Sequence, residues 1–145
     1  MGAESPSRAP VGELAFTVDI PGYTIGRFAE CAGLTVEYEV LEYQEGGQND
    51  FVHKLRGRVK YPNINLKRGL TEEQGLLEWF KRAQDVRERP TVVITLRSPD
   101  ARPLHRWVCT GAFPVKWTGP SLNAGSTGFA TEQLEFAHRG FLPES

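Results

Sequence analysis

The sequence lacks the features of several large protein classes. It has two cysteines, three histidines and one methionine in 145 residues, and its formal net charge is −1 at pH 7. A charge this close to zero provides no global basic field for nucleic acid or an anionic membrane surface. No apolar run approaches the roughly 20 residues of a membrane helix, and the N-terminus has no signal-peptide core. We therefore expect a soluble protein made in the cytoplasm without a signal peptide.

Motifs for covalent chemistry and cofactor binding are also missing. The sequence has no phosphate-binding GxxxxGK[ST], no dinucleotide-binding GxGxxG after a strand and no GxSxG nucleophile elbow. His53, His105 and His138 lie far apart, and none stands at ligand spacing from another histidine, a cysteine or an acid. We predict no catalytic, cofactor-binding or metal-binding residue, and hence no enzyme. Without a secretion signal, we expect Cys31 and Cys109 to be reduced, buried thiols.

The length suits one domain with a real core and is too short for two. Residues 1–12 are small, polar and proline-bearing, so we expect a flexible N-terminal arm. Residues 13–145 would form the single domain.

Two runs of alternating residues flank a Gly-Gly turn between residues 34 and 69, which is the pattern of a long β-hairpin. The first run has an acidic face with Glu37 and Glu39. The second carries a cationic row: Lys54, Arg56, Arg58 and Lys60. The apolar positions of the two runs are Leu34, Val36, Tyr38, Val40, Phe51, Leu55, Val59 and Tyr61. The cationic row is a candidate contact for nucleic acid, but the facing glutamates cancel much of its charge and favour a solvated sheet face.

The hairpin register follows from the requirement that the apolar faces coincide. Closure at Glu45 and Asp50 leaves residues 46–49 as the loop, a common hairpin length. The predicted pairs are Glu39 with Arg56, Glu37 with Arg58, Val40 with Leu55, Val36 with Val59, and Tyr38 with Gly57. Beyond Val40 the apolar phase moves to Leu41 and Tyr43, which predicts a bulge near the turn. A bulged tip on a charged hairpin suggests contact with another surface.

The other elements follow from periodicity and, at residues 91–97, from a short run that is nearly all apolar. Residues 14–20, 91–97 and 129–138 read as strands, residues 106–116 as one alternating strand, and residues 26–33 as a loop or short helical turn. Thr71 and Gln74 form a capping-box pattern before a helix of about three turns, and Pro90 ends that pattern. The expected apolar stripe of the helix is Leu76, Leu77, Phe80 and Ala83. The Glu72-Glu73 pair suits the start of a helix better than a catalytic dyad. We expect a mainly β fold, a sandwich or barrel, with one flanking helix.

Ordered sequence blocks give the chain a family resemblance. They are residues 28–34 (FAECAGL), 42–49 (EYQEGGQN), 54–57 (KLRG), 61–71 (YPNINLKRGLT), Trp79, 114–117 (PVKW), 120–124 (PSLNA) and 132–140 (EQLEFAHRG). In this order they resemble the inner tube proteins of contractile phage tails and related contractile injection systems. The resemblance spans nearly the whole chain after residue 13.

The resemblance implies hexameric rings that stack into a hollow tube, with no covalent chemistry. It implies a contractile sheath outside, baseplate or spike and terminator proteins at the ends, and cargo protein or DNA in the lumen. The subunit itself would not insert into a membrane and would end in a phage tail or injection particle. By this analogy, ring-to-ring or subunit contacts would come from Glu45, Gly46, Gly47, Gln48, Asn49 and Asp50. The residues facing the lumen would be Glu37, Glu39, Lys54, Arg56 and Arg58.

Two alternatives stay open at this point. A tube initiator or baseplate adaptor of the same family would carry much the same blocks. A different class is a monomeric β-barrel that binds a small ligand, or a flavin-type barrel enzyme, which requires a large apolar pocket with a few convergent polar groups. The dense pattern of inward aliphatic and aromatic positions favours a filled interior instead.

Overall fold

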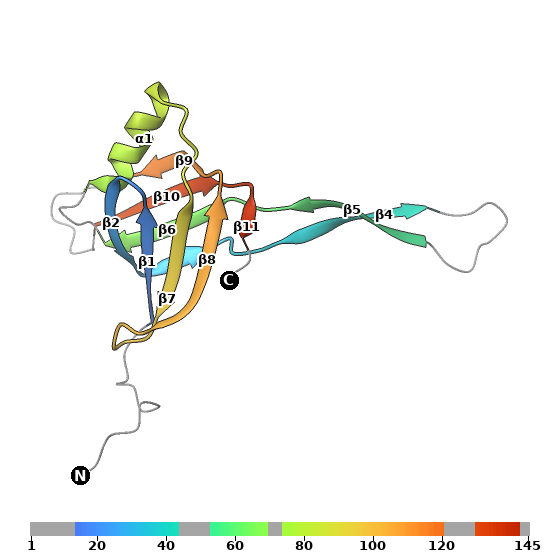
Figure 1. Ribbon diagram of the computed structural model, residues 1–145, viewed down its shortest axis with the longest axis horizontal. Coiled ribbons are helices and arrows are strands. Elements are labelled where there is room, and N and C mark those ends of the chain that lie inside the picture. The colour runs from blue at the N-terminus through green and yellow to red at the C-terminus, as the bar shows by residue number, and fades with distance from the viewer. Residues whose placement is uncertain (1–13, 44–52, 70–73, 121–129, 143–145) are drawn as a thin grey trace, which may run out of the picture.

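The computed structural model describes residues 14–43, 53–69, 74–120 and 130–142 (Figure 1). The N-terminal segment at residues 1–12, which we expected to be flexible, lies outside these ranges. The described strands and the helix, in chain order, are β1 Ala15–Ile20, β2 Tyr23–Phe28, β3 Glu30–Ala32, β4 Glu37–Tyr43, β5 His53–Lys60, β6 Ile64–Gly69, α1 Gly75–Asp85, β7 Val92–Arg97, β8 Pro103–Thr110, β9 Phe113–Thr118, β10 Thr131–Ala137 and β11 Gly140–Leu142. The mainly β fold with one helix is confirmed.

Two sheets form the body and a third stands apart. The five-stranded sheet has the order β11-β8-β7-β1-β2 and the four-stranded sheet the order β3-β6-β10-β9. Among the described residues, β4 and β5 pair only with each other. All neighbouring strands are antiparallel. In the part of the chain that the structure describes, neither large sheet closes on itself, so the sandwich expectation holds and the barrel does not.

The core lies between the two large sheets and under α1. Alternating side chains supply it because each strand buries one face. Its buried apolar residues are Val18, Ile20, Ile25, Phe28, Ile64, Leu66, Leu76, Trp79, Val92, Ile94, Cys109, Ala112, Leu134 and Phe136. Trp79 is a core residue, and Trp107 and Trp117 are partly buried and pack against the core.

Helix α1 covers the open side of the sandwich. It packs against β2 and β9, which are edge strands of the two different sheets. A Cβ on Gly75 would lie 2.2 Å from the carbonyl oxygen of Thr24, so glycine permits the close approach to β2. Covering sheet edges in this way blocks unwanted strand pairing. No helix among the described residues combines the length and apolar character required for a membrane span.

Some details of the helix differ from the predictions made from the sequence. Its most buried side chains are Leu76 and Trp79, whereas Leu77, Phe80 and Ala83 are only half-buried. The predicted capping box is wrong at Gln74, which caps the helix without a side-chain hydrogen bond. Residues 71–73, which include the rest of that box and the acidic pair, lie outside the described ranges.

Two strand expectations also need correction. Residues 26–33, expected as a loop or turn, contain the end of β2 and all of β3. The single strand expected at residues 106–116 is two strands, β8 and β9, divided at Gly111, whose φ is +58°. Phe113 and Val115 are exposed because the turn at Gly111 changes the phase of the alternation, so that Ala112 and Pro114 are the buried residues there. Leu134 and Phe136 on β10 point inward.

A charged pair lies inside the body. Arg68 on β6 and Glu132 on β10 are cross-strand neighbours, with exposed fractions of only 4% and 3%. The Arg68 Nε lies 2.6 Å from Glu132 Oε1, and a guanidinium N–H of Arg68 donates to the carbonyl oxygen of Ile25. The Trp117 indole N–H donates to Glu132 Oε2 at 3.0 Å, and the guanidinium carbon lies 4.8 Å from the centre of the Phe28 ring. Two charges are tolerated here because each is paired and hydrogen-bonded.

The structure predicts that Glu132→Gln destabilises the fold strongly. Removal of the Glu132 charge takes away the carboxylate that lies 2.6 Å from the Arg68 guanidinium, and breaking a buried pair by removing one partner costs about 3–5 kcal/mol. The matched control is Glu39→Gln, because Glu39 pairs with Lys60 at 3.4 Å on the surface, where such pairs are worth about 1 kcal/mol or less. Urea unfolding of both variants measures the difference. Equal losses in the two variants would contradict the prediction.

Candidate functional site: the projecting hairpin

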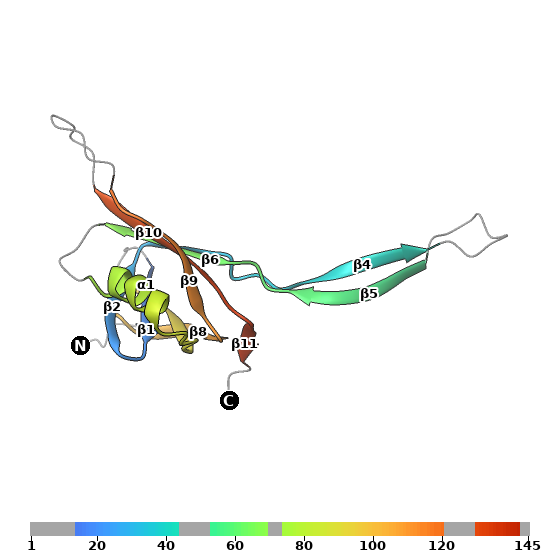
Figure 2. The same cartoon turned by 90° about the horizontal axis from the view of Figure 1, so that it is seen from above.

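Strands β4 and β5 leave the body as a two-stranded arm, and Figures 1 and 2 show this arm extending sideways beyond both sheets. Large apolar side chains along it are 42–59% exposed: Val36, Tyr38, Val40, Leu41, Tyr43, Leu55 and Val59. A lone two-stranded ribbon has little stability in water by itself. Exposed large apolar side chains that gather on one element indicate an interaction surface. We therefore treat the arm as the candidate functional site.

The register of the arm differs from the predicted one. Near the root, Tyr38 pairs with Val59, while farther out Val40 pairs with Arg56 and Leu41 with Leu55. One residue of β4, Glu39, thus faces two residues of β5, which is a β-bulge. The predicted pairing of Tyr38 with Gly57 is therefore wrong. The predicted partners of Glu37, Glu39 and Val40 are also wrong: Glu37 lies opposite Lys60, Glu39 opposite the bulge, and Val40 opposite Arg56. The predicted pairing of Val36 with Val59 is wrong as well, because Val59 pairs with Tyr38.

Gly57 explains why the bulge forms at this position. A Cβ on Gly57 would lie 3.0 Å from the Cβ of Glu39 and 3.1 Å from its carbonyl oxygen. The two backbones can approach only because one side chain is missing. The sequence did indicate a bulge, but the prediction placed it beyond Val40 and paired Gly57 with Tyr38.

The bulge divides the charges of the arm between two faces. Lys54 and Arg56 lie on the face of Val40 and Tyr38, and the guanidinium carbon of Arg56 lies 5.2 Å from the centre of the Tyr38 ring. Lys60 lies on the opposite face, where it pairs with Glu39. The same opposite face carries Leu41 against Leu55 and the Tyr43 ring stacked on His53 at 5.1 Å.

The root of the arm is held by close backbone contacts. Gly33 has φ +96°, and a Cβ there would lie 2.2 Å from the carbonyl oxygen of Asn63. The Asn63 side chain in turn donates to Glu135 Oε2 on β10 at 2.7 Å. The arm is therefore tied to the body at a defined angle.

An aromatic cluster covers the other side of this root. Tyr61, directly after β5, contacts the rings of His138 and Phe141 at centroid distances of 5.6 and 5.7 Å. The Gly140 backbone N–H donates to His138 Nδ1 at 3.2 Å. Gly140 has φ +140°, and a Cβ there would lie 2.9 Å from the Tyr61 ring. Burial lowers the pKa of His138 below its ordinary value of 6.5.

The other predicted site residues are placed as follows. The expected contact tip falls at residues 45–50, which lie outside the described ranges. Of the residues expected to face the lumen, Glu37, Lys54, Arg56 and Arg58 are exposed and Glu39 is half-buried, and they do not share one face.

Cys31 and Cys109 are free, and burial raises the pKa of each thiol to about 12. Among the described residues, no group of three or more His, Cys, Asp or Glu side chains could hold a metal ion.

The outer face of the four-stranded sheet is a second surface, which the sequence analysis did not single out. Its cross-strand neighbours Lys116 and Glu135 have opposite charges, and Gln133 lies between Lys67 and Thr118. A shallow depression of about 120 Å³ lies over this face, lined by Asn65, Lys116, Thr118, Gln133 and Glu135. Alternation along residues 131–135 was the signal that could have identified it.

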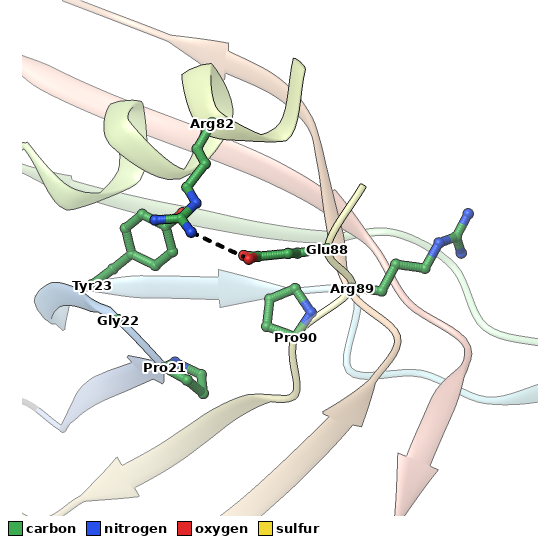
Figure 3. A pocket seen from close by; sticks show the side chains of 7 residues that line it. All are labelled: Pro21, Gly22, Tyr23, Arg82, Glu88, Arg89 and Pro90. Carbon is green, nitrogen blue, oxygen red and sulfur yellow. Dashed lines mark hydrogen bonds and ion pairs between the residues drawn. The ribbon is translucent and has the colours of Figure 1, made fainter. Parts of the chain in front are cut away.

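A third feature is a groove at the far end of α1 from the N-cap. Figure 3 shows Tyr23, Arg82, Glu88 and Pro90 around it. The volume is about 510 Å³. The sequence held no signal for this groove, because its residues come from three separate segments.

Comparison with known proteins identifies the family. A family model described as T4-like virus tail tube protein gp19 matches residues 13–142. The chain belongs to this family. It is a structural tube protein, as the ordered sequence blocks implied.

Solved structures share the fold of this tube protein. A chain in the anti-feeding prophage (AFP) baseplate is 24% identical with a TM-score of 0.73, covering 97% of this chain and 96% of that one. A chain in the sheath/tube terminator of PVC, an extracellular contractile injection system, is 26% identical with a TM-score of 0.71, covering 97% and 98%. Hcp1 from Flavobacterium johnsoniae is 17% identical with a TM-score of 0.51, covering 86% and 90%. No curated protein matched.

The geometry of the bulge yields a prediction for Gly57→Ala. The added Cβ meets the Glu39 backbone and forces the strands apart, at a cost of about 1–3 kcal/mol for such overpacking. Hydrogen exchange would show faster exchange of the β4 and β5 amides, with the body unchanged. Gly69→Ala is the control, because a Cβ there meets nothing within 4 Å. Unchanged protection of the arm in Gly57→Ala would contradict this account.

The root cluster yields a prediction about pH. Since the pKa of His138 is lower in the fold than its ordinary 6.5, the unfolded chain binds the proton more readily, and stability falls as the pH drops below 6.5. We expect His138→Asn, whose amide oxygen can accept the Gly140 N–H, to flatten the fall in unfolding free energy between pH 7 and 5. His105→Asn at an exposed position is the control. A wild-type slope in His138→Asn would be inconsistent with a neutral His138.

Proposed function

We propose that this tube protein forms hexameric rings that stack into the hollow inner tube of a contractile phage tail or injection particle. The observation that carries the proposal is the projecting arm, with seven large apolar side chains at least 42% exposed. In a monomer these side chains face water on a ribbon that no body element covers. Contact with a neighbouring copy would bury them and stabilise the ribbon.

The outer face of the four-stranded sheet suits the lumen of such a tube. It presents charges of both signs and neutral amides in cross-strand neighbours. A cargo could slide along such a surface because no single sign of charge dominates it. The bulge, by contrast, divides the charges of the arm between two faces, and we therefore propose that the arm makes contacts between subunits. The separate expectation from the sequence, that the lumen is faced by Glu37, Glu39, Lys54, Arg56 and Arg58, stays a prediction.

The remaining parts of the proposal concern partners. Similar folds occur in structures titled as a sheath–tube complex, a baseplate, a tube-terminating cap and a terminator. We propose a sheath outside this tube, baseplate and terminator proteins at its ends, and a protein or DNA cargo inside. The chain would act as a rigid conduit in a phage-tail-like particle and perform no covalent chemistry.

The apolar arm predicts that Leu55→Asp abolishes assembly. Leu55 faces Leu41 on the side of the arm that also carries Tyr43, and a carboxylate there opposes burial of that side between copies, because an unpaired buried charge is costly. Negative-stain electron microscopy and native mass at rising concentration would report rings and tubes for the wild type and single subunits for the variant. Val86→Asp, at an exposed position after α1, is the control and should still assemble.

Other outcomes of the same measurement separate the alternatives. Single rings that never stack would indicate an initiator or terminator role within the family. A wild-type monomer at every concentration that carries a bound small molecule would contradict the tube proposal. Normal tubes from Leu55→Asp would remove the arm from the assembly mechanism.

A further inference from the structure

The groove beside α1 has features that the tube proposal does not use. Tyr23 opens β2, Arg82 belongs to the last turn of α1, and Glu88 lies in the connection from α1 to β7. In Figures 1 and 2, α1 and the arm lie on opposite sides of the body. A partner bound beside α1 would therefore leave the arm free.

An ion pair closes one side of this groove. Arg82 Nη2 lies 3.4 Å from Glu88 Oε1, and the two side chains are 59% and 49% exposed (Figure 3). Exposed pairs of this kind contribute little to stability, so a second carboxylate can replace Glu88 on Arg82 at low cost.

The Tyr23 hydroxyl is the second unusual feature. Its oxygen is buried and, among the described residues, has no hydrogen-bond partner. Burial also raises the pKa of Tyr23, so the hydroxyl keeps its proton at neutral pH. Buried polar groups without partners are rare in native proteins and are costly. A hydroxyl that stays protonated beside a guanidinium is a ready donor for a carboxylate.

A neighbouring groove extends the surface. It has a volume of about 310 Å³ and shares Glu88 and Arg89 with the first groove. The Arg89 guanidinium carbon lies 4.6 Å from the centre of the exposed Phe113 ring. Cations outnumber carboxylates along residues 81–89, with Lys81, Arg82, Arg87 and Arg89 against Asp85 and Glu88. Two adjoining grooves that combine cations with an aromatic ring fit an extended peptide better than a small anion.

We propose that these grooves bind an acidic peptide segment of a partner protein, and that Arg82 and the Tyr23 hydroxyl hold one of its carboxylates. The carboxylate replaces Glu88 on Arg82 and accepts the hydroxyl hydrogen bond. Apolar side chains of the segment then pack on Phe113 and Pro114. Because the groove is distant from the arm, the proposal does not depend on the hexameric tube.

The test uses the full chain and a fluorescein-labelled peptide that alternates Glu and Leu, with a Gln-and-Leu peptide as the control probe. Fluorescence anisotropy should show binding of the acidic peptide and none of the neutral one. Tyr23→Phe should weaken binding about tenfold, which matches a lost hydrogen bond to a charged group. Arg82→Gln should abolish binding.

Glu88→Gln gives the most specific expectation. Removal of the competing carboxylate should tighten binding about two- to fivefold, the equivalent of an exposed ion pair. This increase keeps the proposal testable even if a weakening variant is poorly folded. Arg106→Gln on β8 is the matched control, because β7 and β1 separate β8 from β2 in the sheet.

Three results would overturn the proposal. The first is equal weakening by Arg106→Gln and Arg82→Gln, which would mean nonspecific attraction. The second is unchanged or weaker binding in Glu88→Gln. The third is full competition by free glutarate at matched carboxylate concentration, which would mean a small-anion site.

Discussion

The buried pair of Arg68 and Glu132 is the constraint on which the body depends. It joins β6 to β10, and through Ile25 and Trp117 it also reaches β2 and β9. Charges in a protein interior are stable only when all partners are in place. Because a shift of β2, β6, β9 or β10 would separate these groups, the pair favours one alignment of the two sheets.

Helix α1 and the arm place stability and assembly in different parts of the chain. The helix buries Leu76 and Trp79 and covers edge strands of both sheets. The arm contributes almost nothing to the core and exposes its apolar side chains instead. Because the core of the sandwich forms without the arm, the arm is available for contacts with other chains. This separation explains how a small domain can carry a long apolar ribbon and still fold.

Sequence periodicity predicted much of this fold but few of its contacts. Alternation located β1, β10 and the hairpin, because polar and apolar residues follow a period of two there, and a short apolar run located β7. The hairpin register was wrong because a single bulge at Gly57 breaks the assumption of unbroken alternation. The strands around Gly26 and Gly33 were missed because glycines leave no side chain to alternate. The pair of Arg68 and Glu132 spans 64 residues of sequence, and no local pattern encodes such a contact.

The root of the arm has a mechanical consequence. At Gly33 a backbone carbonyl occupies the place of a side chain, and Asn63 passes the connection to Glu135 on β10. The arm is therefore fixed to the body at one end, and bending of β4 and β5 would be resisted mainly by β6 and β10. These are the two central strands of the four-stranded sheet, where pairing on both sides leaves the least freedom. A pulling force or torque on β4 and β5 would therefore act mainly on β6 and β10, rather than on α1 and the outer strands.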